Sequence, residues 1–324
     1  MSRPDTGRRA VVLGCAGQDG SYLTEQLVDH GYQVHGVARP GRHPHLDAVR
    51  DAITVVELDL RQTAEVGALL ADVRPHELYN CAAVSFGPDA WADPTTTAEV
   101  GAVALAGLLD AVRDRSPETR LFHSSSSWVF GQAQTSPQNE ATPYRASDPY
   151  GATKAYGDFL LRAYRERYGL FLVSGILFNH ESPRRSERFV TRKITAAAAR
   201  ISAGSREHLE LGDLSALRDW GYAADYMDCA RRSLQAAEPM DYVIGSGTLH
   251  SVTDVLRVAF GQVGLEWRDH VRFDSDLVRS SADVPALVAD ATRAREVLGW
   301  TPSVAFEDLV ALMVEADARR VRAD

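Results

Sequence analysis

The stretch RRAVVLGCAGQDGSYL, residues 8–23, decides the fold of this chain. Its apolar run Ala10–Leu13 predicts a short buried strand, and a helical pattern follows directly. Between them lie glycines at three-residue spacing, which permit a tight turn and a close approach of the backbone to a pyrophosphate. The first amide groups of the helix would attract that anion, so the stretch predicts a dinucleotide-binding turn. The candidate cofactor-binding residues of this turn are Gly14, Gly17, Gln18, Asp19 and Gly20.

Strand-like and helical patterns alternate from this turn to about residue 175. Such alternation predicts parallel βαβ units, and hence an α/β fold with a Rossmann-type doubly wound parallel sheet. We expect strands near residues 10–14, 33–38, 53–58, 77–82, 120–124 and 171–178. We expect helices in this half near residues 20–30, 62–72, 96–113 and 150–168.

The rhythm breaks after residue 175, where polar and aromatic loop segments separate the helical patterns. Helices are expected there near residues 188–204, 223–237, 251–262 and 305–318. No linker or internal repeat interrupts the chain. We therefore expect a dinucleotide-binding domain at residues 1–175 and a smaller, interwoven α+β substrate lobe at residues 176–324, with approximate boundaries.

The end of the second strand, QVHGVA, indicates which nicotinamide cofactor is used. In NAD-binding folds an acid near this point accepts hydrogen bonds from the ribose 2′-hydroxyl. Here Arg39 and Arg42 follow the strand, and no carboxylate occurs before Asp47. Arginine suits a 2′-phosphate, so the sequence favours NADP over NAD. Two solvated loop charges are the alternative interpretation of these arginines.

Composition and charge exclude several classes of function. The chain has 324 residues, 45% of them apolar, and a net charge of −9 without a long basic run, which argues against nucleic-acid and anionic-membrane partners. Its three cysteines have no metal spacing and suggest no disulfide framework. No run of apolar residues approaches the length of a membrane span, and the N-terminus lacks a signal sequence. We therefore expect a cytoplasmic protein without a metal site.

The stretch DPYGATKAY places Tyr150 and Lys154 one helical turn apart, on the same face of the helix. A free phenol has a pKa of about 10 and is a poor base at neutral pH. A nearby ammonium favours the phenolate, so we expect Lys154 to lower the pKa of Tyr150. An incidental pair on a surface helix is the alternative for these two residues taken alone.

A family resemblance follows from five motifs. The run GILFNHESPRRSERFVTRKIT at residues 175–195 closely resembles GDP-mannose 4,6-dehydratases of the extended short-chain dehydrogenase superfamily. The runs GQDGSYL, SPQNEATPY, LGDLSALRDWGYAADYM and DATRAREVLGW resemble the same group, and the match covers nearly the whole chain. The resemblance implies a GDP-hexose substrate and transient oxidation of the sugar. It also implies a homodimer or homotetramer formed by the helices near residues 96–113 and 150–168.

The resemblance assigns roles to individual residues. It implies that Ser126 binds the sugar C4 oxygen, that Tyr150 takes the C4 hydroxyl proton, and that Lys154 lowers the pKa of that tyrosine and binds the nicotinamide ribose. Arg218 would clamp the diphosphate with its planar fork of donors. Arg279 fits as a second such ligand only with a one-residue insertion. The implied substrate-binding residues are Ser85, Trp128, Asn179, Phe189, Val190, Lys193, Arg218 and Arg279, and the implied adenine neighbours are Asp59 and Leu60. For Arg184, Arg185 and Arg192, surface or oligomer contacts are an equal alternative.

The chain departs from this family at its hexose pocket. Where the dehydratases have the glutamate that removes the C5 proton, this chain has Trp128, which offers no base. Val84 and Phe86 stand where the family has a glutamine and a histidine. Neutral drift in an enzyme that keeps its reaction is the alternative. Another carboxylate could replace the missing base, and the candidates are Asp89, Glu181 and Glu187.

The sequence therefore predicts a GDP-hexose-modifying enzyme with tightly held NADP(H), in which oxidation survives and elimination is impaired. We expect a redox-neutral isomerase, either an epimerase or a pyranose–furanose mutase. Three alternatives stay open. They are a true GDP-mannose 4,6-dehydratase, a reductase of GDP-4-keto-6-deoxyhexoses, and an inactive dinucleotide-sensing regulator.

Overall fold

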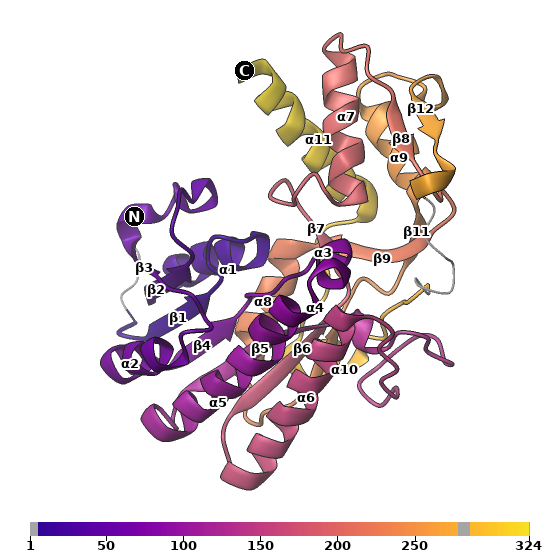
Figure 1. The fold of residues 1–324 in the computed structure, drawn as a ribbon. Helices are drawn as coiled ribbons and strands as arrows, with labels where there is room; N and C mark the ends of the chain where they lie inside the picture. Colours follow the sequence, from indigo (N-terminus) through magenta and orange to yellow (C-terminus); the bar gives the residue numbers. More distant parts are fainter. Residues whose placement is uncertain (1–5, 278–285, 324) are drawn as a thin grey trace.

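The computed structural model describes residues 6–277 and 286–323 of the chain. Seven parallel strands form the main sheet, in the order β10-β6-β5-β4-β1-β2-β3 (Figure 1). The predicted α/β fold with a Rossmann-type parallel sheet is confirmed. The strands are β1 (Arg9–Leu13), β2 (Gln33–Ala38), β3 (Ile53–Glu57), β4 (Glu77–Asn80), β5 (Arg120–Ser126), β6 (Leu172–Leu177) and β10 (Tyr242–Ile244).

Helices cover both faces of this sheet. On one face lie α2 (Thr63–Val73), α5 (Ala104–Arg115) and α6 (Pro149–Tyr168), and on the other lie α1 (Gln18–Asp29), α8 (Ala223–Ser233) and α10 (Thr292–Leu298) (Figure 1). Side chains alternate along β1, so that Val11 and Leu13 join the first core and Ala10 and Val12 the second. All four are buried, which explains why the strand reads as a continuous apolar run.

The helix expected near residues 96–113 consists of three pieces. α4 (Pro94–Ala98) continues through a π-helical turn at Glu99–Val103 into α5. By length and composition the stretch Pro94–Arg115 could cross a membrane, contrary to the sequence-based expectation, but a single helix of this kind is weak evidence. Leu105, Leu108 and Leu109 of this stretch are buried against the sheet.

The remaining elements form a third core above the carboxyl ends of the main strands (Figure 1). It has a three-stranded sheet, β11-β9-β7, and a two-stranded sheet, β12-β8. The elements are β7 (Asn179–Glu181), β8 (Leu209–Leu211), β9 (Leu217–Tyr222), β11 (Leu249–Ser251), β12 (Val271–Phe273), α7 (Val190–Ser202), α9 (Val252–Gln262) and α11 (Phe306–Ala323). Strands of three residues carry too little pattern to be expected from the sequence, and neither they nor α3 (Gly87–Ala92) and α10 were predicted.

Candidate active site

The turn between β1 and α1 requires glycine and fits a dinucleotide. Gly14 has a φ of +79°, and a Cβ there would lie 3.0 Å from backbone atoms of Ala82. A Cβ at Gly20 would lie 2.3 Å from the carbonyl oxygen of Gly14. Helix α1 begins after Gly17, and its described N-terminus has no side-chain cap. Its first amide groups can therefore bind a pyrophosphate.

The same turn is joined to the second lobe by a half-buried ion pair. Asp19 on α1 contacts His180 on β7, with 3.0 Å between Oδ2 and Nε2. Burial opposes both charges, but the charge of His180 and its hydrogen bond hold the pKa of Asp19 below its usual value. Burial alone would lower the pKa of His180. The charge of Asp19 and its hydrogen bond outweigh burial, so the pKa of His180 is raised. Sequence reasoning missed His180, for which the only signal was its place beside Asn179.

Two kinds of ribose-binding group meet at the end of β2. Arg39 and Arg42 follow the strand and are exposed. Glu57 ends the neighbouring strand β3, and its Oε1 accepts a hydrogen bond from the amide of Gly41 at 3.4 Å. Sequence reasoning missed Glu57 because it considered only the residues that follow β2. The arginines suit a 2′-phosphate and the carboxylate suits a 2′-hydroxyl, so both cofactors have a candidate partner here.

Asp59 and Leu60, the expected adenine neighbours, follow β3. The carboxylate of Asp59 forms an ion pair with Arg61 at 2.7 Å, and Arg61 also contacts Glu99 at 3.2 Å. These three charged side chains line a cavity of about 630 Å³. The cavity is also lined by Glu99 and Val103 of the π-helical turn, so this turn borders the place expected for the adenine.

Tyr150 lies in the first turn of α6, which begins where Asp148 accepts a hydrogen bond from the amide of Gly151 at 2.9 Å. The expectation of a lowered pKa for Tyr150 is wrong for the chain by itself. Burial raises the pKa of Tyr150 to about 12, although a hydrogen bond from Ser126 works in the opposite direction. The structure thus brings Ser126 and Tyr150 together, but a phenol in this environment is not ionised at neutral pH.

Lys154 is 2% exposed, and its Nζ lies 5.6 Å from the centroid of the Tyr150 ring. That Nζ donates to the carbonyl oxygen of Ser124 at 2.6 Å. Burial lowers the pKa of Lys154 to about 8, against the opposing effect of the carboxylate of Asp158. Ser126, Tyr150 and Lys154 therefore converge where β5 ends and α6 begins.

Trp128 occupies a short helical turn, Ser127–Val129, directly after β5. Its backbone amide donates to the hydroxyl of Ser126 at 3.3 Å. A Cβ at Gly151 would lie 2.6 Å from the carbonyl oxygen of Trp128, so this turn packs tightly against the first turn of α6. Trp128 thus flanks the converging Ser126 and Tyr150.

The carboxylates considered as replacements for the missing base all have other partners. Asp89 forms two hydrogen bonds with Arg188, at 2.6 and 2.7 Å. Glu181 accepts from the hydroxyl of Thr191 at 2.6 Å and lies 3.2 Å from Arg185. Glu187 contacts Arg200 at 3.1 Å. Each of the three carboxylates is therefore already bonded to an arginine or a hydroxyl group.

Aromatic contacts join the loop after β4 to the second lobe. The rings of Phe86 and Phe189 meet edge to face, with centroids 5.3 Å apart. Arg188 lies over Phe86 and Arg185 over Phe189, at 4.0 and 3.4 Å from the ring centroids. The polar Ser85 is exposed and Val84 partly buried in the same loop. The loop that departs from the family pattern therefore contacts the segment expected to bind guanine.

The other expected substrate residues are spread over the second lobe. Asn179 begins β7, and Phe189 and Val190 stand at the start of α7. Lys193 lies in the next turn of α7, and its Nζ donates to the carbonyl oxygen of Glu210 at 2.7 Å. Arg218, on β9, donates to the carbonyl oxygen of Leu217. Arg279 lies outside the described residues.

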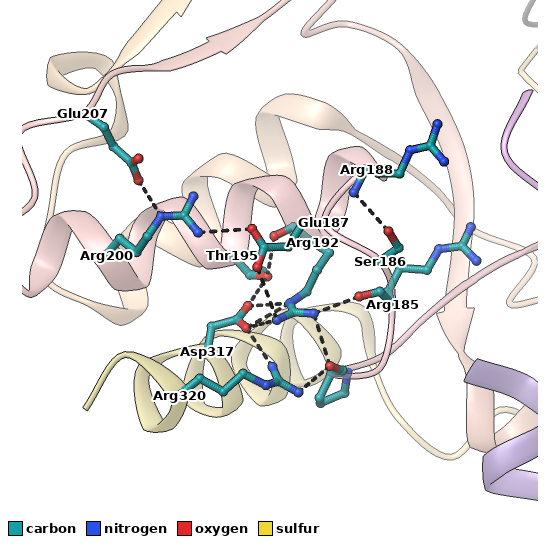
Figure 2. Close-up of polar contacts among 11 residues, drawn as sticks. Arg185, Ser186, Glu187, Arg188, Arg192, Thr195, Arg200, Glu207, Asp317 and Arg320 are labelled. Carbon is teal, nitrogen blue, oxygen red and sulfur yellow. Dashed lines mark hydrogen bonds and ion pairs between the residues drawn. The ribbon is translucent and has the colours of Figure 1, made fainter. Parts of the chain in front are cut away.

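Hydrogen bonds and ion pairs around the buried Arg192 hold the loop that leads into α7 (Figure 2). Arg192 is 7% exposed and binds the carboxylate of Asp317 on α11, with its Nε at 2.9 Å from both carboxylate oxygens. Arg192 also donates to the carbonyl oxygen of Arg185, and Arg320 donates to that of Pro183. The interpretation of Arg192 as a surface residue is therefore wrong. Arg184 pairs with Glu25 within the same chain.

Replacement of Asp317 by alanine is expected to lower the free energy of unfolding by about 3–5 kcal/mol, because it leaves Arg192 buried without its counter-charge. Urea-induced unfolding measures the effect. Glu315→Ala is the matched control, since Glu315 lies on the same helix and is 68% exposed in its ion pair with Arg319. The control is expected to change stability by less than about 0.5 kcal/mol. Equal stability of the two variants would contradict a stabilising role for the Arg192–Asp317 pair.

Comparisons with known proteins agree on one family. A family model described as GDP-mannose 4,6 dehydratase matches residues 11–313. The chain is 42% identical over 323 residues to GDP-mannose 4,6 dehydratase 1 of Arabidopsis thaliana, covering 95% of this chain and 89% of that protein.

Solved structures resemble the chain in fold. The dTDP-glucose 4,6-dehydratase of Bacillus anthracis, solved with NAD, has a TM-score of 0.85 at 18% identity, covering 97% of this chain and 98% of that one. The RMD protein of Pseudomonas aeruginosa, solved with NADPH, has a TM-score of 0.83 at 21% identity, covering 97% and 99%.

Proposed function

Because this chain belongs to the GDP-mannose 4,6-dehydratase family, we propose that it binds a GDP-hexose and transiently oxidises the sugar at C4. The observation that supports the oxidation is the convergence of Ser126, Tyr150 and Lys154 at the end of β5. The glycine turn before α1 supports a nicotinamide dinucleotide as the second ligand. The protein is accordingly an enzyme of the short-chain dehydrogenase superfamily that acts on nucleotide sugars.

Each residue of this site has a separate role in the proposed oxidation. Ser126 would hold the C4 oxygen, and Tyr150 would take its proton once that oxygen is bound. Lys154 is close enough to stabilise a phenolate electrostatically, which matters because burial alone disfavours one. A bound nicotinamide would supply the acceptor, and later the donor, of the hydride. Asn179 and Arg218 are our candidates for the diphosphate, and Phe189 with Lys193 for the guanine.

For the fate of the oxidised sugar we propose redox-neutral isomerisation, carried by a single observation. Trp128, which has no proton acceptor, stands two residues after Ser126 with its amide bonded to that hydroxyl. The three nearby carboxylates considered above are engaged by Arg188, by Thr191 with Arg185, and by Arg200. Return of hydride to the opposite face would give an epimer. Return after a change at the ring oxygen would give a furanose.

Dehydration is the second candidate, and the comparisons favour it over isomerisation. The family match spans most of the chain, and the Arabidopsis relative, identical at 42% of the aligned positions, is named a dehydratase. Under this alternative a residue other than the one at position 128 removes the C5 proton. The two candidates share the oxidation step and differ only in the fate of the keto sugar.

The product of GDP-mannose and other GDP-hexoses tests the proposal. Purified protein is incubated with each sugar nucleotide and NADP, and the products are separated and weighed by mass spectrometry. Unchanged mass with a new retention time supports isomerisation, and loss of one water means dehydration. Consumption of added NADPH with a gain of two hydrogens means reduction. Absence of turnover with every GDP-hexose, together with retained dinucleotide binding, would make the protein a regulator.

We propose NADP as the cofactor, on the basis of Arg39 and Arg42. Replacement of both by alanine is expected to weaken NADP binding at least about 100-fold, since hydrogen bonds to charged groups contribute about 1.5–3 kcal/mol each. NAD binding should not change. Calorimetric titration measures both affinities, with Arg257→Ala, an exposed arginine on α9, as control. If instead Glu57→Gln weakens NAD binding and the arginine variant binds NADP normally, the cofactor is NAD.

We further propose a homodimer or homotetramer. Val103, Phe159 and Trp91 are 64%, 57% and 65% exposed, on or near the helices that the family resemblance assigns to the subunit interface. Exposure of large apolar side chains at one place is typical of an interaction surface. Light scattering of the purified protein measures the mass in solution.

A further inference from the structure

A buried carboxylate lies on α6 one helical turn beyond Lys154. Asp158 is 0% exposed, and the oxidation proposed above gives it no role. Three hydroxyl groups donate to it, those of Ser125 at 2.7 Å, Tyr144 at 2.9 Å and Ser174 at 2.5 Å. An ionised carboxylate in the interior is costly unless it is hydrogen-bonded and serves a nearby charge. Asp158 meets the first condition with three hydrogen bonds, and Lys154 is the charge to consider for the second.

Two adjacent serines of β5 connect the carboxylate with the lysine. The carbonyl oxygen of Ser124 accepts the hydrogen bond from Lys154, and the hydroxyl of the next residue, Ser125, donates to Asp158. Ser174, on the neighbouring strand β6, donates to the other carboxylate oxygen. These hydrogen bonds hold α6 against β5 at Lys154 and against both β5 and β6 at Asp158. The same register places Tyr150 beside Ser126.

Other charged or titratable groups surround this pair. His123 on β5, Cys81 after β4, Asp19 on α1 and Tyr150 on α6 lie near Lys154. On the far side, Tyr144 and Asp241 influence Asp158, and Arg162 forms hydrogen bonds with both of them. Asp241 is also paired with Arg165. The carboxylates of Asp158 and Asp19 are therefore the acidic groups that influence Lys154, and Asp158 is the one on its own helix.

We propose that Asp158 is a positioning residue that keeps Lys154 in its cationic form inside the protein and holds it in register beside Tyr150. The function of Lys154 comes from the proposed oxidation, on which this inference rests. The charge state of Lys154, however, is a property of the chain alone. It can be measured without substrate or cofactor.

The electrostatics of the pair support this proposal. Burial lowers the pKa of Lys154 to about 8, and the charge of Asp158 works against that effect. Burial raises the pKa of Asp158 to about 6, against its hydrogen bonds with Ser174 and Ser125. Both groups are therefore charged together between about pH 6 and pH 8. Loss of the carboxylate charge should move the titration of Lys154 to lower pH, which leaves half of the lysine or less protonated at pH 7.

The sequence offers an unusual means of testing this. Lys154 and Lys193 are the only lysines among the 35 lysines and arginines of the chain. Protein labelled with ¹³C- and ¹⁵N-lysine therefore gives two sets of side-chain NMR signals, which a Lys193→Arg variant assigns. Lys193 is half-buried, with its Nζ bonded to the carbonyl oxygen of Glu210 at an exposed position, and it serves as the internal control. The pH dependence of the Cε shifts reports the ionisation of each lysine.

Asp158→Asn, which keeps the shape and removes the charge, is expected to lower the titration midpoint of Lys154 by at least about one pH unit. The midpoint of Lys193 should not move. Ser174→Ala, which removes one hydrogen bond but leaves the carboxyl group in place, is the matched control and should shift the midpoint less. An unchanged midpoint for Lys154 in Asp158→Asn would overturn the proposal.

Two further measurements keep the test decisive. If Asp158→Asn does not fold, Asp158→Ser also removes the charge and leaves room for water, and the same shift is expected. In the unaltered protein, Lys154 should be mostly protonated at pH 7, and a neutral Lys154 there would overturn the proposal without any variant. A shifted midpoint in a protein that turns over no GDP-hexose would instead count against the proposed function and leave the charge pairing intact.

Discussion

Tyr150→Phe is expected to lower kcat by about 10²–10⁴-fold or more, because the variant has no phenolate oxygen to accept the proton of the sugar C4 hydroxyl. Burial raises the pKa of the unligated tyrosine to about 12, so the side chain acts as a base only when the surrounding charges favour its phenolate. Affinity for the GDP-hexose should stay unchanged, since the diphosphate and guanine are expected to contact other residues. Turnover and calorimetric binding are measured on the same preparation.

Tyr156→Phe is the matched control, since it makes the same change on the same helix at a residue 45% exposed. It should leave both turnover and binding as they are. Appreciable turnover in Tyr150→Phe would mean that hydride chemistry through this tyrosine is not the route. The oxidation proposed here would then fall, whichever product the enzyme forms.

Trp128→Glu is expected to introduce water loss from GDP-mannose. A glutamate at position 128 would follow Ser126 by two residues, on the short turn that packs against the start of α6. General base catalysis contributes about 10²–10⁴-fold, so the dehydrated product should form at least about 100-fold faster than in the parent protein. Mass spectrometry of the reaction products, with time, measures the rate.

Trp128→Gln is the matched control, because glutamine has nearly the shape of glutamate and cannot take a proton at neutral pH. It should not dehydrate the sugar. Equal rates for the two variants would mean that the pocket, and not the base, limits elimination. Brisk dehydration by the parent protein would show that a different group removes the C5 proton, and the isomerase proposal would be wrong.

The sheet could be predicted from the sequence because its signals are local. The glycine turn and the alternating patterns predict the six strands β1–β6 to within about two residues, and the helix expected at residues 150–168 spans Pro149–Tyr168. The helix expected near residues 96–113 is interrupted by a π-helical turn at Glu99–Val103, and no proline within that turn marks the interruption in the sequence. Short strands of the second lobe form by pairing with distant segments, and pattern alone cannot reveal such partners.

The sequence predicts which residues converge at the site, but it does not predict the direction of their pKa shifts. Ser126, Tyr150 and Lys154 converge as expected, but their spacing says nothing about burial, which reverses the expected direction of the pKa of Tyr150. His180 and Asp19 lie 161 residues apart in sequence and meet only in the folded chain. Glu57 and Asp158 were missed for the same reason. The pairing of the strand of Glu57 with β2, and the hydroxyl groups around Asp158, are formed only in the folded chain.

The fastening of Arg192 by Asp317 has a consequence for how the protein is made. The two residues are 125 positions apart, so a nascent chain on the ribosome exposes Arg192 long before α11 emerges. Until then the arginine that supports the loop at residues 183–188 lacks its partner. Ribosomes stalled before codon 317 would therefore carry chains in which this loop has no bond to the last helix.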